Sequence, residues 1–161
     1  MRKVVVVDTS LVLKWVINEP DSEKALALLT KWSTERVEIH APALLTYEAT
    51  NSLYQKVRSG KYTLDGAKQS LVDVIFSELE LDFSQDAALS VRALEFADRF
   101  GLQTTYDPHY LALAEREGCE LWTADTRMWR IVRSELPRVH WIGDYHPANG
   151  DTSPSETESG N

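Results

Sequence analysis

The sequence predicts an α/β fold with a central, mostly parallel sheet. The short run of four valines at residues 4–7 is typical of a buried central strand. Similar short segments alternate along the chain with longer stretches whose apolar residues repeat at helical spacing. Strands and helices that alternate in this way form βαβ units, in which the strands run parallel.

Short apolar segments are predicted to be strands, and the amphipathic stretches between them are predicted to be helices. The strands are residues 2–7, 37–40, 79–83, 120–123 and 139–142. The helices are residues 9–16, 21–32, 42–58, 64–78, 86–100, 110–116 and 126–134. Capping side chains such as those of Asp8 and Thr9 indicate helix starts, and Gly101 and Gly118 indicate helix ends.

The composition indicates one folded domain without a broadly basic surface. A chain of 161 residues suits a single domain with its own core. The formal net charge of -8 argues against a general basic surface for nucleic acid. It does not exclude a nuclease, because metal ions neutralise phosphate locally. The one cysteine, Cys119, cannot form an internal disulfide.

Neither a targeting segment nor a membrane span is expected. The apolar run after Arg2 and Lys3 is too short for a signal peptide, and no apolar stretch is long enough to cross a bilayer. We therefore expect a cytoplasmic protein. Its domain is expected to occupy residues 1–145, followed by a disordered acidic tail at residues 146–161 that lacks large apolar side chains.

Four carboxylates mark places where predicted elements begin, end or pack. Asp8 follows the first strand, and Asp125 follows the strand at residues 120–123. Asp107 precedes a predicted helix, whereas Glu48 lies inside one. In parallel sheets, ligands bind beyond the carboxyl ends of the strands, so these acids are expected to converge. Converging acids repel one another unless a cation lies between them, which predicts a hard divalent metal and phosphate chemistry.

Each acid also has an ordinary structural explanation. Asp8, Asp107 and Asp125 are placed to cap the helices that follow them, and aspartate is a favoured cap. Glu48 cannot be a cap, although it could be an exposed helical glutamate. Asn51, one helical turn further on, is placed to hold its carboxylate. Capping and metal binding are compatible, because a carboxylate has two oxygens.

Hydroxyl groups next to two of the acids are candidate supporting groups. Thr123 lies two residues before Asp125 in an extended segment, so both side chains point to the same side and the hydroxyl could orient a carboxylate or a water. Thr9 directly follows Asp8, in a stretch of capping side chains. These positions predict that the acids are held by neighbouring hydroxyls.

The order of these features resembles the PIN-domain nucleases, and within them the VapC-type toxin ribonucleases of toxin–antitoxin systems. The resemblance extends over about residues 1–143. The matching segments are Val6-Val7-Asp8-Thr9-Ser10 with Lys14-Trp15, Pro42-Ala43-Leu44 with Tyr47-Glu48-Ala49, Tyr106-Asp107 with Tyr110-Leu111-Ala112-Leu113-Ala114, and Thr123-Ala124-Asp125.

This resemblance implies a PIN-like three-layer α/β/α sandwich that binds Mg²⁺ or Mn²⁺ and hydrolyses RNA. Carried over by position, the catalytic and metal-binding acids are Asp8, Glu48, Asp107 and Asp125, with Thr123 in support. The resemblance also implies a small antitoxin as partner, and self-association as a homodimer.

Two other functions are compatible with parts of the sequence. One is a PIN-fold module that binds metal or a partner but has little catalytic activity. The other is a phosphotransfer domain, which is disfavoured because Ser10 stands where an aspartate-nucleophile phosphatase needs a second aspartate. For a nuclease, Lys14 and Arg127 are candidate phosphate contacts, although each could equally be an ordinary solvated charge.

Overall fold

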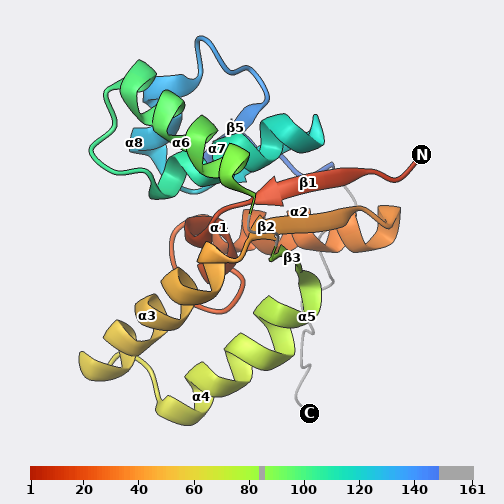
Figure 1. The fold of residues 1–161 in the computed structure, drawn as a ribbon. Coiled ribbons are helices and arrows are strands. Elements are labelled where there is room, and N and C mark those ends of the chain that lie inside the picture. Colours follow the sequence, from red (N-terminus) through yellow and green to blue (C-terminus); the bar gives the residue numbers. More distant parts are fainter. Residues whose placement is uncertain (84–85, 149–161) are drawn as a thin grey trace, which may run out of the picture.

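The computed structural model describes residues 1–83 and 86–148 and has a five-stranded parallel sheet at its centre (Figure 1). The strands lie in the order β3-β2-β1-β4-β5, and each pairs with its neighbours in parallel. Their bounds are β1 Val4–Val7, β2 Glu38–Pro42, β3 Glu80–Asp82, β4 Glu120–Thr123 and β5 Val139–Trp141. The predicted parallel sheet is confirmed, and all of its described pairings are parallel.

Helices cover both faces of the sheet, so the fold has three layers. Figure 1 shows α6, α7 and α8 on one face, with α1 and α2 on the other. This division follows from right-handed crossovers, because the chain moves outward from β1 to β3 and then returns past β1 to β4 and β5. The helices are α1 Thr9–Leu13, α2 Ser22–Glu35, α3 Leu44–Arg58, α4 Leu64–Gln69, α5 Phe76–Glu78, α6 Ala87–Phe100, α7 Tyr106–Glu117 and α8 Thr126–Val132.

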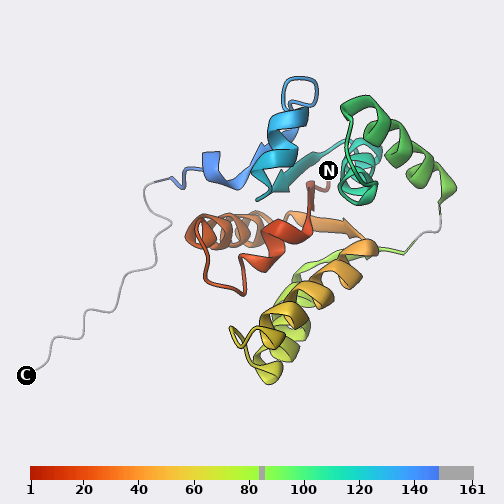
Figure 2. The same ribbon diagram turned by 90° about the vertical axis from the view of Figure 1, so that its left-hand side faces the viewer.

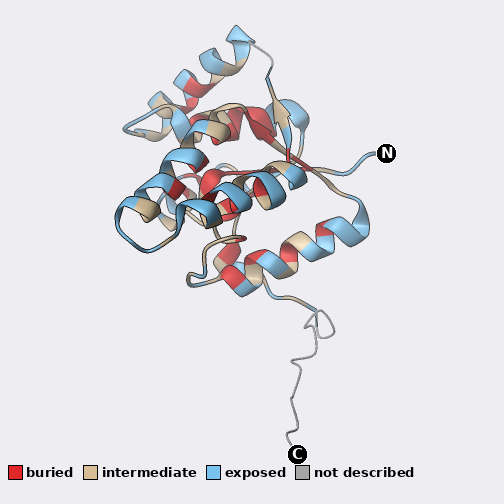
Figure 3. Ribbon diagram, turned by 90° about the horizontal axis from the view of Figure 1, so that it is seen from below, coloured by how far each residue is buried: buried red, intermediate tan, exposed pale blue. Residues whose placement is uncertain are grey.

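The core lies between the sheet and its two helical layers. Val6 and Val7 of β1 have no exposed surface, because β1 is central and covered on both faces. Leu11 from α1, Leu45 from α3 and Leu113 from α7 are also fully buried. Figure 3 shows buried residues along the strands and the inward sides of the helices. Among the described residues, no helix is long and apolar enough to cross a membrane.

The stretch predicted as one helix at residues 64–78 contains a π-helical segment. This segment, Ser70–Ile75, separates α4 from α5, and both of its end residues are buried. Figure 2 shows α3 and α4 side by side, and residues of these two helices are in contact. The broken helix thus returns the chain along α3 to the edge strand β3.

The first predicted helix is too long, and the predicted tail lies mostly outside the described residues. The first helix ends at Leu13 rather than at residue 16, because Lys14, Trp15 and Val16 bond to carbonyls three residues earlier and form tight turns. The structure describes residues 146–148 of the predicted tail, which form neither helix nor strand. The remainder of the predicted tail, from residue 149 onward, lies outside the described residues.

Candidate functional site

The carboxyl ends of β1 and β4 form the place where the sheet topology reverses. The chain builds β1, β2 and β3 toward one edge, and β4 then pairs with the other side of β1. Open parallel sheets bind ligands at such a reversal point. Asp8 directly follows β1, and Asp125 lies two residues after β4, so both flank this point. The sheet therefore places two of the predicted acids at its most favourable ligand site.

Asp8 is buried and held by three hydrogen bonds. One carboxylate oxygen accepts the Leu11 amide at 3.1 Å, which caps α1, and the Ser10 hydroxyl at 2.7 Å. The other oxygen accepts the Thr123 hydroxyl. Burial raises the pKa of Asp8 to about 7 even though these bonds lower it, and the nearby Asp107 raises it further. Capping and a place in the acid site are thus combined in one side chain.

The Thr123 hydroxyl joins the two turns that carry Asp8 and Asp125. Thr123 is completely buried, donates to Asp8 and accepts the Asp125 amide at 2.9 Å. Ser10 makes a parallel link, because its hydroxyl donates to Asp8 and accepts the Ala124 amide at 2.9 Å. Ser10 was not predicted as a site residue, although its place two residues after Asp8 is a signal that could have identified it. Together these hydroxyls fix the β1 and β4 ends to each other.

Glu48 is held by groups other than the predicted Asn51. Its carboxylate accepts the Tyr110 hydroxyl at 2.6 Å and the Thr9 hydroxyl at 3.2 Å. Asn51 is exposed, and its side-chain oxygen accepts from Gln55 at 3.5 Å. Among the described residues, no bond joins Asn51 to Glu48, so the prediction that Asn51 supports this acid gains nothing from the geometry. Tyr110 is the supporting group that sequence reasoning missed.

Asp107 lies within a helix and is not a cap. The helix α7 begins at Tyr106, four residues before its predicted start, and its N-cap position is Thr105. The predicted capping role of Asp107 is therefore wrong, and Pro108 fits because the first-turn amides have no helical acceptor. The Asp107 carboxylate is half-buried and accepts no hydrogen bond from any residue in 1–83 or 86–148. Burial, then Asp125 and Glu48, raise its pKa to about 6.

Asp125 caps a helix and lies close enough to Asp107 to affect its pKa. One of its oxygens accepts the Met128 amide at 3.1 Å and so caps α8, as the capping alternative predicted. Its charge is one of the causes of the raised pKa of Asp107. The structure therefore brings the four predicted acids into one electrostatically coupled group, because Asp107 also interacts with Asp8 and Glu48.

The chemistry of this donor set fits a hydrated divalent ion. In the part of the chain that the structure describes, no three histidine, cysteine, aspartate or glutamate side chains are placed to ligate one ion directly. Mg²⁺ commonly keeps several waters and uses one or two carboxylates. Asp107 and Asp125 are the best placed to bind the ion directly. No described residue donates a hydrogen bond to the Asp107 carboxylate, and the cap engages only one of the two Asp125 oxygens. Asp8 and Glu48 would then act through water or after small side-chain rotations.

A recess of about 230 Å³ opens beside Asp107 and Asp125. Leu102 and Met128 line it together with Arg127. The Arg127 side chain is exposed and makes no ion pair with any described residue, so its guanidinium is available to an anion. Among the described residues that line this recess, Arg127 is the one base.

Lys14 is engaged in the turn between α1 and α2. Its ammonium group donates to the Pro20 carbonyl at 2.8 Å and lies 3.5 Å from a Glu19 carboxylate oxygen. Only 14% of its side chain is exposed. A role of Lys14 in substrate binding would require these contacts to break, which makes it the weaker of the two predicted phosphate contacts.

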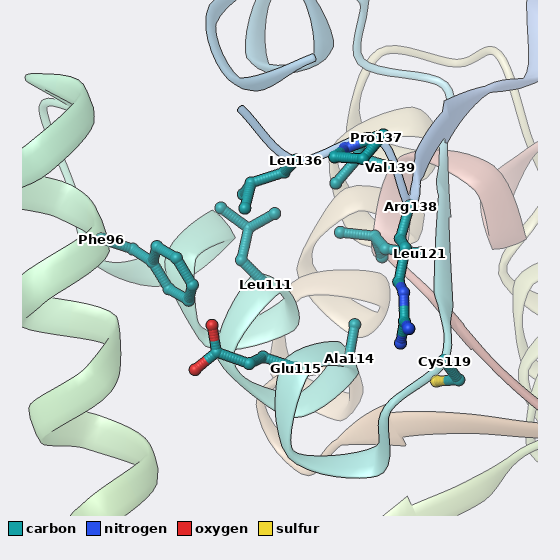
Figure 4. Close-up of a pocket in the computed structure, with 10 residues that line it drawn as sticks. All are labelled: Phe96, Leu111, Ala114, Glu115, Cys119, Leu121, Leu136, Pro137, Arg138 and Val139. Atoms are coloured by element: carbon teal, nitrogen blue, oxygen red, sulfur yellow. The ribbon is translucent and has the colours of Figure 1, made fainter. Parts of the chain in front are cut away.

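A second recess, of about 240 Å³, is apolar and lies between α6, α7 and the segment before β5 (Figure 4). None of the four acids lines it. Its Glu115 carboxylate pairs with Arg92 at 2.7 Å, and burial raises the pKa of the Cys119 thiol to about 11. Both features disfavour a reactive nucleophile or base in this recess, and the acid group remains the candidate site.

Replacing Thr123 with valine should destabilise the fold, because valine has a similar shape but no hydroxyl. The Asp125 amide would lose its acceptor and Asp8 would lose a donor in a fully buried place. We expect the free energy of unfolding to fall by about 1–3 kcal/mol. Urea denaturation would measure the loss, with Thr123→Ser as the control that keeps the hydroxyl. A valine variant as stable as the serine variant would contradict this role.

Comparisons with known proteins identify the family and the fold. The family model of the PIN domain matches residues 5–133. Ribonuclease VapC3 of Pyrobaculum aerophilum is 30% identical over 123 residues, which are 76% of this chain and 90% of that protein. The crystal structure of PAE2754 from the same organism is 27% identical, with a TM-score of 0.62 over 81% of this chain and 87% of that chain. It confirms the predicted three-layer fold.

A more distant structure shares the fold alone. It is the crystal structure of VapBC2 from Rickettsia felis bound to a DNA fragment from their promoter, and it is 19% identical to this chain. Its TM-score is 0.59, over 86% of this chain and 96% of that chain. The arrangement of sheet and helices is therefore similar even though the two sequences have little in common.

Proposed function

Because this chain belongs to the PIN-domain family, we propose that it is a Mg²⁺- or Mn²⁺-dependent endoribonuclease that hydrolyses RNA phosphodiester bonds. The observation that carries the proposal is the environment of the Asp107 carboxylate. A half-buried carboxylate with a raised pKa and no hydrogen-bond donor among the described residues is costly to keep beside Asp125 and Glu48. A divalent cation would remove that cost. The similarity to ribonuclease VapC3 supports RNA as the substrate.

In this proposal the four acids hold the metal, and the hydroxyls hold the acids. Asp107 and Asp125 would bind the ion, with Asp8 and Glu48 completing its shell directly or through water. The bound ion would supply charge stabilisation at the phosphate and a more acidic water. Thr123 keeps Asp8 oriented through its hydrogen bond, whereas Tyr110 and Thr9 keep Glu48 oriented. No side chain of the protein is needed as nucleophile.

RNA cleavage with and without metal tests this function. We expect cleavage of a labelled RNA with Mg²⁺ or Mn²⁺ and none with EDTA. Cleavage that persists after chelation would contradict metal dependence. Titration with Mn²⁺ in the same preparation separates the alternative of a catalytically weak module, which would bind the ion but leave the RNA intact. A protein that neither binds Mn²⁺ nor cleaves RNA would exclude both.

Arg127 is proposed to contact an RNA phosphate next to the scissile bond. Its guanidinium lines the recess beside Asp107 and Asp125, and it makes no ion pair with any residue described. Arg127→Met should raise the KM for RNA by about tenfold, which corresponds to about 1.4 kcal/mol, and change kcat little. The matched control is Arg130→Met, which removes an exposed arginine of the same helix that does not line the recess. Equal KM values for both variants would argue against this contact.

The antitoxin partner and the homodimer are also proposals. Structures similar in fold are described as a toxin–antitoxin complex from Klebsiella pneumoniae and as VapBC-1 from nontypeable Haemophilus influenzae. We expect the neighbouring gene to encode a small protein that copurifies with this chain and blocks its RNA cleavage. Such a protein would support a toxin role in the cytoplasm. Light scattering of the isolated chain would give its oligomeric state, and a monomer would contradict the homodimer.

A further inference from the structure

The hydroxyl of Tyr110 has two described hydrogen-bond partners, and both are side chains of the acid site. It donates to the Glu48 carboxylate at 2.6 Å and lies 2.8 Å from the Thr9 hydroxyl. The tyrosine is 1% exposed and lies on α7 three residues after Asp107, so one helical turn carries both groups. Its ring is fixed in the core while its hydroxyl reaches the edge of the site.

Glu48 needs such a restraint more than Asp8 and Asp125 do. Asp8 and Asp125 have short side chains and cap helices with one oxygen, so their backbones hold them. Glu48 has a longer, more flexible side chain on α3. Repulsion between its negative charge and that of Asp107 would turn it toward solvent. Among the described residues, its donors are only Tyr110 and Thr9. Both are neutral, so they hold the carboxylate without a cation that would compete with a metal.

We infer that Tyr110 is a positioning residue that holds the Glu48 carboxylate toward Asp107 and so sets the affinity of the acid group for a divalent cation. This inference rests on the proposed function only in that the site binds metal. It assigns the hydroxyl a role beyond packing, since the ring alone would fill the same space in the core. Thr9 is the second part of the same restraint.

The test replaces Tyr110 with phenylalanine in the full chain and measures Mn²⁺ binding by isothermal titration calorimetry. Loss of the hydroxyl should weaken Mn²⁺ binding by roughly 10–100-fold, the usual effect of removing a group that orients a ligand. The Mn²⁺ concentration for half-maximal RNA cleavage should rise by a similar factor. The kcat at saturating Mn²⁺ should change less, because the acids themselves remain.

Tyr62→Phe is the matched control. Its hydroxyl lies 2.5 Å from the Ser70 hydroxyl, away from the acids, so this variant also loses one hydroxyl–hydroxyl contact. It should bind Mn²⁺ as the unmodified protein does. Thr9→Val should also weaken Mn²⁺ binding. Thr9→Ser, which keeps a hydroxyl, should bind Mn²⁺ as the unmodified protein does. Thermal melting of all four variants separates a loss of folding from a loss of affinity.

Unchanged Mn²⁺ affinity in Tyr110→Phe would overturn the inference and leave Tyr110 as a packing residue, whatever the result for Thr9→Val. Equal weakening in Tyr62→Phe would also overturn it, because the effect would then be one of general stability. If the unmodified protein binds Mn²⁺ with the expected variant effects but does not cleave RNA, the proposed ribonuclease function fails and the positioning role stands. If the unmodified protein binds no Mn²⁺, the positioning role fails as well.

Discussion

Replacing Asp107 with asparagine is expected to lower RNA cleavage by about 10³-fold while leaving the metal-free protein at least as stable as before. These two effects have opposite signs because Asp107 has no hydrogen-bond donor among the described residues and lies close to Asp125 and Glu48. Its charge therefore destabilises the metal-free fold and becomes favourable only when a cation is bound. Loss of about 4 kcal/mol of stabilisation by the metal corresponds to the expected decrease in rate.

The measurement combines single-turnover cleavage with urea denaturation in EDTA. Asp98→Asn is the control, since Asp98 is exposed near the end of α6 and has no ion pair in the described structure. It should change neither quantity. Full activity of Asp107→Asn would remove Asp107 from the proposed metal site. Reduced activity together with a large loss of metal-free stability would mean that Asp107 has a structural role that its lack of contacts does not explain.

The position of the acids can be predicted from sequence because it depends on strand direction. Once β1 and β4 are taken as parallel neighbours, the residues after their carboxyl ends must lie together, which brings Asp8 near Asp125. Thr123 is predictable for the same reason, because side chains two residues apart in an extended segment point to the same side. Local chain geometry determines these placements, so a single sequence is enough.

The support of Glu48 cannot be predicted in this way because it depends on packing between helices. Asn51 is the natural candidate within α3, since it is one turn away. The actual donor, Tyr110, comes from α7, and α4, α5, β3 and α6 lie between α3 and α7 in the sequence. Helical spacing shows which residues of one helix are neighbours, but not which face of another helix packs against them. The early start of α7 at Tyr106 was missed because an Asp-Pro pair more often begins a helix.

The metal-free protein is expected to lose stability as the pH rises from about 5 to about 8. Burial raises the pKa of Asp8 from 3.8 to about 7, and burial with neighbouring acids raises that of Asp107 to about 6. A folded-state pKa above the unfolded value means that the fold prefers the protonated acid. Its contribution to stability is complete below the unfolded pKa and is lost as the pH rises through the folded pKa. Glu38 and Glu120, whose pKa values are lowered, are ionised in both states here and add no slope.

Urea denaturation in EDTA at several pH values from about 5 to about 8 measures this loss of stability. For Asp8 it amounts to about 3 kcal/mol, because about two units of the raised pKa lie above pH 5 and each unit is worth 1.36 kcal/mol. Asp8→Asn should remove most of it, because asparagine caps α1 as well as aspartate does but does not ionise. Saturating Mg²⁺ should also flatten the slope in the unmodified protein, since a bound cation favours the ionised acids and stabilises the folded state by mass action. A slope that Mg²⁺ leaves unchanged but Asp8→Asn removes would mean that Asp8 is merely a buried acid. Only the flattening by both changes connects its raised pKa with metal binding.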